Sequence, residues 1–116
     1  MKYTVVVTSF NCQSTISRVL DSILQLSDKP NEIILIDDAS SDETVSVVLK
    51  RQNEFDNLRL VQNSNNVGQS FSRNSGVREA SNQFVVFMDD DDFSYPERSK
   101  IHLLSLAAGA DFSYVS

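Results

Sequence analysis

Residues of several special types are scarce in this sequence. Its 116 residues include no tryptophan, one cysteine, one histidine, two prolines and three glycines. The lone cysteine, Cys12, excludes an internal disulfide and a thiolate cage for zinc, so we interpret it as a small, half-buried residue in a protein from a reducing compartment. Basic side chains are also few, 10 against 16 acidic ones. Without a basic stripe to neutralise phosphates, DNA and RNA are not expected ligands.

Long apolar runs are missing as well. None approaches the ~20 consecutive apolar residues that span a bilayer, and no helix offers a polybasic face to a membrane surface. The apolar start turns polar at Thr8, too early for a signal peptide. We therefore expect a cytoplasmic protein without a transmembrane segment, with peripheral association at the inner membrane face left open for the full-length protein.

The formal net charge of -6 comes from two short clusters. Their members are Asp37, Asp38, Asp89, Asp90, Asp91 and Asp92. Taking these six from the 16 acidic side chains leaves as many acids as there are bases, 10 of each. The negative charge therefore marks two particular places in the fold.

Apolar, β-branched runs alternate with helical patterns along the chain. Strands are predicted at 3–7, 32–36, 58–61, 84–88 and 111–115, and helices at about 14–26, from 40, at 69–80 and from about 96. Nearly continuous Val, Ile and Leu runs are typical of strands covered on both faces, as in a parallel sheet. Residues 1–116 are therefore expected to form one open α/β domain. In such sheets ligands bind outside the carboxyl ends of the strands.

The helical patterns also predict helix starts and core-facing side chains. Ser40 and Glu43 have capping-box spacing at the start of the second helix, and Pro96 is a favoured first-turn residue for the fourth. The side chains expected to face the core are Ile16, Val19, Leu20, Ile23 and Leu24 in the first helix, Val45, Val48 and Leu49 in the second, and Ile101, Leu104 and Ala108 in the fourth.

Four consecutive aspartates at 89–92 directly follow a predicted strand. At a strand end they would repel one another strongly unless a cation neutralised them. Carboxylate oxygens suit Mg²⁺ or Mn²⁺, which complete their coordination with water and substrate phosphates. A calcium loop is excluded because no glycine stands at its sixth position. The alternative interpretation is a solvated acidic turn.

Asp37 and Asp38 follow the second predicted strand. A carboxylate at this point of a nucleotide-binding fold can accept a hydrogen bond from a ribose hydroxyl or from a base N–H. The alternative is a polar loop before a helix N-cap, a role that Ser40 or Ser41 could fill alone.

The segment 66–76 opens the third predicted helix. Gly68 permits a tight turn, and Arg73 offers a charged fork for a phosphate or a base carbonyl, with a structural ion pair as its alternative. Gly76 inside the helix costs up to ~1 kcal/mol relative to alanine, which suggests close packing or ligand approach. The spacing is not GxGxxG, and no GxxxxGK[ST] phosphate loop is present.

Together, four segments in this order resemble the N-terminal, nucleotide-sugar-binding half of the GT-A-fold glycosyltransferases of family 2. They are Val5-Val-Val-Thr-Ser-Phe-Asn11, Ile34-Leu-Ile-Asp-Asp-Ala-Ser-Ser-Asp-Glu-Thr44, Asn66-x-Gly68 with Arg73-Asn74-x-Gly76, and Phe87-Met-Asp-Asp-Asp-Asp-Phe93 followed by Pro96. The resemblance implies a truncated three-layer α/β/α, Rossmann-like GT-A fold with a mostly parallel sheet. It also implies transfer of a sugar from a nucleotide-diphosphate sugar, with a UDP-sugar favoured, to an acceptor hydroxyl, as in polysaccharide or glycoconjugate synthesis.

The same resemblance implies roles for single residues. The nucleotide-binding set is Thr8, Phe10, Asp37, Asp38, Arg73 and Asp90. Phe10 would lie beside the base with Thr8 as a polar neighbour, and Asp38 would accept from the uracil N–H while Asp37 supports its loop. Arg73 would reach the base or the diphosphate.

The acidic run would serve the ribose and the metal. Asp90 sits where a ribose contact is expected, while Asp89 and Asp91 form the D-x-D motif, with Asp91 as the direct metal ligand. The ion, Mn²⁺ or Mg²⁺, would bridge the diphosphate and act as a Lewis acid. The acceptor, a saccharide or a lipid-linked molecule, would bind a half that lies beyond residue 116 together with the general base of inverting members. No catalytic residue is therefore assigned in this chain, which we expect to be inactive alone.

The sequence stops in or just after a predicted strand with no closing helix, which suggests a piece of a longer protein. An uncovered sheet edge would allow two copies to pair as a homodimer. His102 is interpreted as a surface or partly packed residue. Two alternative functions stay open from the residues: a Mg²⁺-dependent phosphohydrolase or phospho-acceptor domain, and a non-catalytic nucleotide-binding or assembly module.

Overall fold

The computed structural model describes residues 2–89 and 104–105 of the chain. Within them, helices and strands alternate as the sequence predicts. The elements are β1 (Tyr3–Ser9), α1 (Ile16–Leu24), β2 (Glu32–Asp37), α2 (Thr44–Arg51), the 3₁₀ helix η1 (Gln52–Glu54), β3 (Leu58–Gln62), α3 (Gln69–Glu79), β4 (Phe84–Asp89) and β5 (Leu104–Ser105).

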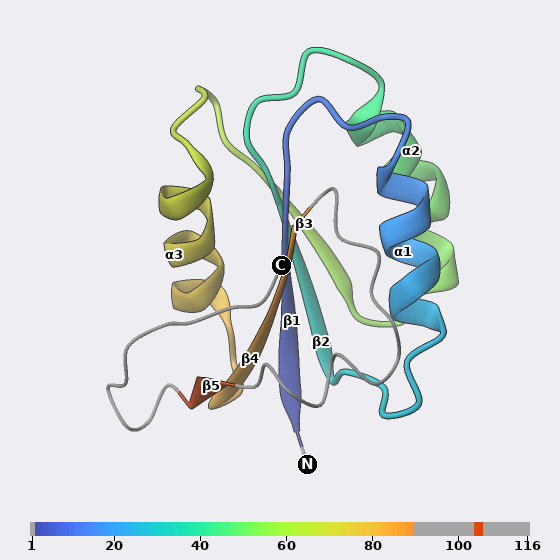
Figure 1. Cartoon of the computed structure of the whole chain (residues 1–116), viewed down its shortest axis with the longest axis vertical. Helices are drawn as coiled ribbons and strands as arrows, with labels where there is room; N and C mark the ends of the chain where they lie inside the picture. The colour runs from blue at the N-terminus through green and yellow to red at the C-terminus, as the bar shows by residue number, and fades with distance from the viewer. Residues whose placement is uncertain (1, 90–103, 106–116) are drawn as a thin grey trace.

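The described strands form one sheet in the order β3-β2-β1-β4-β5. β1 to β4 are parallel, and β5 pairs with β4 in the antiparallel sense. Helices α1 and α2 cover one face and α3 covers the other (Figure 1), which gives the expected three layers. The chain runs outward from β1 to β3 and then returns to the other side of β1, so the strand order switches between β1 and β4. Ligands of open α/β sheets bind at such a switch point.

Successive residues of the central strand β1 face opposite sides of the sheet, and all seven of its residues are buried. Val5 and Val7 belong to the larger core cluster, which includes the inner side of α1. Val6 packs on the α3 side in a smaller cluster. The buried residues of α1 are Ile16, Val19, Leu20 and Ile23. Leu24 is only half-buried, while Leu26, beyond the helix, is 1% exposed.

Gly76 explains how α3 approaches the sheet so closely. A Cβ atom at this position would lie 2.3 Å from Val6 Cγ1, far inside van der Waals contact. Of the two interpretations offered by the sequence, close packing is therefore the one that the structure supports.

The second helix departs from its predicted start. It begins at Thr44, and the Thr44 backbone N–H donates to Asp42 Oδ1 at 2.9 Å. The predicted capping box is wrong because Ser40 uses its hydroxyl elsewhere, as a donor to Asp37. Leu49 is also not in the core: its exposed fraction is 51%, and Val48 is the fully buried apolar residue of α2.

Two further expectations need correction. Leu104 lies in β5, paired with Val85, where the spacing of apolar residues predicted a helix; pairing with the edge of β4 overrides the local pattern. The other residues of that helix, with Pro96, Ile101, His102 and Ala108, and the predicted strand 111–115 lie outside the described residues. Cys12 is buried rather than half-buried. No helix in residues 2–89 or 104–105 is long and apolar enough to cross a membrane.

Candidate functional site

Within residues 2–89, the polar residues predicted to bind a ligand meet at the carboxyl ends of the strands. Strand register places Ser9 beside Asp37, and Thr8 between Ile36 and Asp89. Thr8 is buried, and Phe10, in the loop directly after β1, has an exposed fraction of 44%. Asp37 and Asp89, the first residue of each acidic cluster, therefore flank the end of β1 at the switch point.

Asp37 is bound on both carboxylate oxygens by neighbouring protein groups. Its Oδ1 accepts from Ser9 Oγ at 2.8 Å and from Ser40 Oγ at 2.6 Å, and its Oδ2 accepts from the Ser40 N–H at 2.9 Å. The residue is 1% exposed. These contacts make Asp37 a link between the end of β1 and the loop that follows β2.

Asp38 has a different set of partners, from the loop between β3 and α3. Its Oδ1 accepts from Asn63 Nδ2 at 2.9 Å and from the Val67 N–H at 2.8 Å, and its Oδ2 accepts from the Gly68 N–H at 2.9 Å. Burial by itself would raise the pKa of the Asp38 carboxyl, but the hydrogen bonds from Val67, Asn63 and Gly68 outweigh it and hold the pKa below its usual value. Asp38 is therefore ionised at neutral pH although it is only 4% exposed.

The loops after β1 and β2 are joined by reciprocal hydrogen bonds. The Asn11 N–H donates to Ser40 Oγ at 2.9 Å, and Asn11 Oδ1 accepts from the Ser41 N–H at 2.8 Å. Asn11 and Ala39 both have positive φ, 46° and 62°. This conformation is uncommon for residues with a side chain and is kept only where surrounding contacts enforce it. The loop that carries Phe10 is therefore held in one shape before any ligand arrives.

The third side of this edge is the start of α3. Gly68 precedes the helix with φ 96°, a conformation that glycine adopts readily. Its carbonyl accepts from the Ser72 N–H at 3.1 Å. Arg73 follows in the next turn, half-buried, with its Nε shielded from solvent. Arg73 thus belongs to the same edge as Asp38.

The metal hypothesis falls largely on residues that the structure does not describe. Asp89 closes β4 in register with Thr8, whereas Asp90, Asp91 and Asp92 lie outside the described residues. In the described part of the chain, no three His, Cys, Asp or Glu side chains come together as a metal site would require. The roles of Asp89 and Asp91 therefore stay predictions.

Sequence reasoning missed three residues of this edge as functional neighbours: Ser9, Ser40 and Asn63. All three hydrogen-bond to the Asp37–Asp38 pair. Ser9 and Asn63 each stand at or directly after the end of a parallel strand, which is a signal that sequence analysis could have used, because such ends share one edge. Ser40 was assigned to the helix instead.

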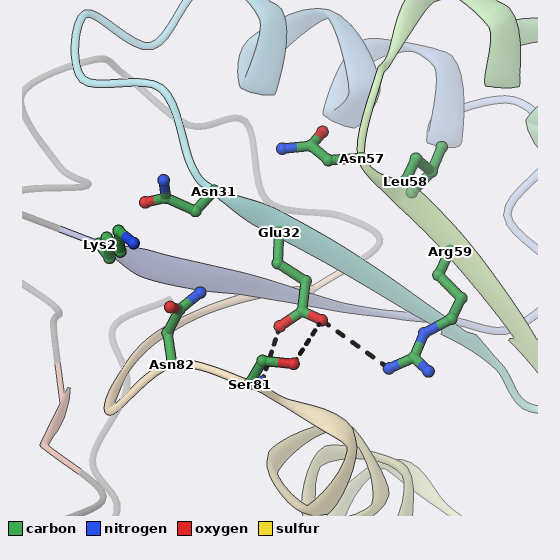
Figure 2. A pocket seen from close by; sticks show the side chains of 8 residues that line it. All are labelled: Lys2, Asn31, Glu32, Asn57, Leu58, Arg59, Ser81 and Asn82. Atoms are coloured by element: carbon green, nitrogen blue, oxygen red, sulfur yellow. Dashed lines mark hydrogen bonds and ion pairs between the residues drawn. The ribbon is translucent and has the colours of Figure 1, made fainter.

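A hollow of about 610 Å³ lies at the opposite edge, where the amino ends of β1, β2 and β3 meet the loop before β4. Figure 2 shows Glu32 at its centre, bound to Ser81 and facing Arg59. Glu32 Oε1 accepts from the Ser81 N–H and from Thr4 Oγ1, both at 2.8 Å. These contacts hold strand ends together at the edge opposite to Thr8, Asp37 and Asp38.

Comparisons with known proteins agree with the resemblance seen in the motifs. The sequence profile of glycosyl transferase family 2 matches residues 4–116. The chain is similar to the GalNAc(5)-diNAcBac-PP-undecaprenol beta-1,3-glucosyltransferase of Campylobacter jejuni, with 40% identity over 92 residues, which cover 78% of this chain and 30% of that protein.

Two solved structures share the fold. TarS 1-349 of Staphylococcus aureus, in complex with UDP-GlcNAc, superposes with a TM-score of 0.77 at 32% identity, over 94% of this chain and 30% of that one. The mannosyltransferase PcManGT of Pyrobaculum calidifontis, in complex with GDP-Man and Mn²⁺, gives a TM-score of 0.70 at 31% identity, over 77% of this chain and 27% of that one. The chain thus spans less than a third of the length of each of these proteins.

Proposed function

Because the chain belongs to glycosyl transferase family 2, we propose that it is the donor-binding part of an inverting, metal-dependent glycosyltransferase. The donor would be a nucleotide-diphosphate sugar, with a UDP-sugar favoured, and the acceptor a hydroxyl of a saccharide or lipid-linked molecule. Family membership favours this reading over the phosphohydrolase alternative and over a purely structural module.

The observation that carries the proposal is the state of Asp38. An ionised carboxylate offers about four acceptor positions, and the three hydrogen bonds from Asn63, Val67 and Gly68 leave Oδ2 with capacity for another donor. Uracil supplies such a donor at N3–H, which cytosine lacks. The exposed ring of Phe10 offers a stacking surface at the same edge. An acceptor with a flat apolar neighbour suits a uracil base.

A UDP-sugar is supported further by the TarS comparison, because that protein's solved complex contains UDP-GlcNAc. Guanine also carries an N–H next to a carbonyl, and the PcManGT complex contains GDP-Man. UDP and GDP binding must therefore be compared in the same titration.

The diphosphate end of the donor would depend on the acidic run. Asp89 and Asp91 would hold Mn²⁺ or Mg²⁺, Asp90 would bind the ribose, and Arg73 would contact the diphosphate. Consecutive carboxylates are the hard oxygen donors that these ions prefer, and the Mn²⁺ in PcManGT supports the choice. The ion would offset the charge that develops on the leaving diphosphate.

Residues beyond 116 would supply the acceptor site and the general base. The chain alone is then expected to bind the donor without transferring the sugar. Calorimetric titration of UDP with and without Mn²⁺ tests the proposal: we expect binding that strengthens with the metal, and weaker binding of GDP. Uridine, which has no phosphate, should bind weakly, with an affinity that does not depend on Mn²⁺. A folded sample that binds UDP in neither condition would contradict the proposal.

A matched pair of variants locates the base. Base-to-aromatic stacking is worth about 1–3 kcal/mol per base, so Phe10→Ala should weaken UDP binding roughly 5- to 150-fold. Leu49→Ala removes a similarly exposed apolar side chain from α2 and should leave UDP binding unchanged. Equal effects of the two variants would argue against a base at Phe10.

A further inference from the structure

Asn63, the first residue after β3, makes hydrogen bonds to three different parts of the site. Its backbone N–H donates to the Asp37 carbonyl at 2.8 Å. Its side-chain Nδ2 donates to Asp38 Oδ1 at 2.9 Å and to Ser72 Oγ at 3.1 Å. Both hydrogens of the carboxamide are therefore directed to protein acceptors, and the side chain is unavailable as a direct ligand donor.

These contacts link the end of β2 to helix α3. Asp38 stands at the end of β2, and Ser72 is a fully buried residue of α3. Arg73 follows Ser72 directly, so the position of Asn63 bears on both the carboxylate and the cation expected to contact the nucleotide. A donor is needed here, because only an N–H or O–H can satisfy Asp38 Oδ1 and the Ser72 hydroxyl oxygen together.

We propose that Asn63 is a positioning residue for nucleotide binding, which holds the Asp38 carboxylate ionised and in one orientation while it ties that carboxylate to α3. The inference rests on the proposed function, because it assumes that Asp38 receives a base N–H. Asn63 acts through Asp38 and does not itself contact the nucleotide.

Two variants separate this role from general support of the fold. Asn63→Asp replaces the donor by a second carboxylate facing Asp38, and Asn63→Leu removes the donor without adding charge. Asn65→Asp is the control, since it makes the same charge change at an exposed position of the same loop. Asp37 on β2, Asp89 at the end of β4 and Arg73 on α3 also carry charge at this edge, and they are the same in all variants.

The test is UDP titration in the presence of Mn²⁺, on the full chain, from pH 8 to pH 5. Each variant is compared with the unchanged chain at the same pH, so that titration of the UDP phosphate, near pH ~6, cancels. Thermal unfolding at each pH verifies that the variants are folded.

At pH 8 we expect Asn63→Asp to bind UDP about tenfold or more weakly, because two facing carboxylates repel and one hydrogen bond to a charged group is lost. Near pH 5 the coupled pair takes up one proton, and the resulting O–H can donate to Asp38 Oδ1. The gap to the unchanged chain should then shrink to about threefold or less. Asn63→Leu has no group that can take up this proton, so its UDP binding should stay weak at every pH. The charge of Asn65→Asp is screened by solvent and should change UDP affinity by less than about twofold.

A constant affinity ratio for Asn63→Asp across the pH range, or full affinity in Asn63→Leu, would overturn the positioning role while leaving the proposed function intact. If Asn63→Asp failed to fold, the recovery of its UDP affinity at low pH could not be measured. Full UDP affinity in folded Asn63→Leu would still overturn the positioning role, and loss of UDP affinity at every pH would support it. Absence of UDP binding by the unchanged chain at every pH would instead overturn the proposed function, and this inference with it.

Discussion

Replacing Gly76 by alanine should destabilise the domain, although alanine is the better helix former. Helix propensity alone would stabilise α3 by about 0.8–1.0 kcal/mol. Against this, the new Cβ would meet three atoms of Val6, at 2.3, 3.1 and 3.3 Å. Val6 is fully buried and lies in the central strand between β2 and β4, so it cannot move aside. Overpacking of this kind costs about 1–3 kcal/mol, so after the gain in helix propensity we expect a net loss of up to about 2 kcal/mol.

A double-mutant cycle isolates the contact. Val6→Ala removes both Cγ atoms that crowd position 76 and keeps only the Cβ of residue 6. This change should lower the free energy of unfolding by roughly 1–3 kcal/mol through the lost burial and the cavity. In that background Gly76→Ala should become neutral or stabilising by up to about 1 kcal/mol. The two changes should therefore couple strongly, with the double variant more stable than the sum of the single effects predicts.

Urea denaturation followed by far-ultraviolet circular dichroism measures each free energy of unfolding. Asn74→Ala, at an exposed position of the same helix, is the control and should stabilise by up to about 0.7 kcal/mol. If Gly76→Ala stabilised the chain as Asn74→Ala does, α3 would not be held against β1 at this distance. Close packing of α3 on β1 would then not be what places Arg73 beside the strand ends.

Two more outcomes follow from the charged groups at either end of the sheet. Asp38→Asn should lower the free energy of unfolding by about 1–3 kcal/mol at pH 7. Because the pKa of Asp38 is lower in the folded than in the unfolded chain, the stability that its carboxylate supplies is present above the unfolded pKa of about 3.9 and is lost as pH falls through the folded pKa. The denaturation curves of the variant and the unchanged chain should therefore converge in acid. Glu32→Gln should weaken the hydrogen bonds and the ion pair with Thr4, Ser81 and Arg59 and lower the free energy of unfolding by about 1–2 kcal/mol, while UDP affinity stays unchanged. A loss of UDP affinity would show that the hollow of Figure 2 is energetically coupled to the nucleotide site.

The strands could be predicted from sequence because buried parallel strands require runs of apolar, β-branched residues, and each of the four runs that lie within residues 2–89 forms a strand. Their polar ends could not. β1 continues through Thr8 and Ser9, two polar residues beyond the predicted end of the strand, because β2 pairs with both and β4 pairs with Thr8. The Ser9 hydroxyl is then satisfied by Asp37, a residue 28 positions away. Such pairings depend on strand register, which no local pattern encodes.

The error at the second helix has the same origin. Ser40 and Glu43 fit a capping box locally, but the backbone of Ala39 has positive φ, and the Ser40 hydroxyl lies between Asp37 and Asn11. The Ser40 hydroxyl therefore hydrogen-bonds to groups from other parts of the chain and does not cap the helix. Asn63 was missed for a related reason, because its importance comes from the two chain segments that it joins.

Hydrogen bonds balance the charge of Asp37 and Asp38, and this bears on where the proposed cation would act. Asp37 and Asp38 receive hydrogen bonds from backbone and side-chain donors on both carboxylates. Such bonds stabilise an ionised carboxylate without any metal. Asp37 and Asp38 therefore need no divalent ion, and the ion that we propose would belong to the cluster that begins with Asp89, the last residue of β4. It follows that the base end and the diphosphate end of the site should respond separately to chelation: removing Mn²⁺ should reduce the advantage of UDP over uridine to what Arg73 alone supplies, while the weak affinity for uridine remains.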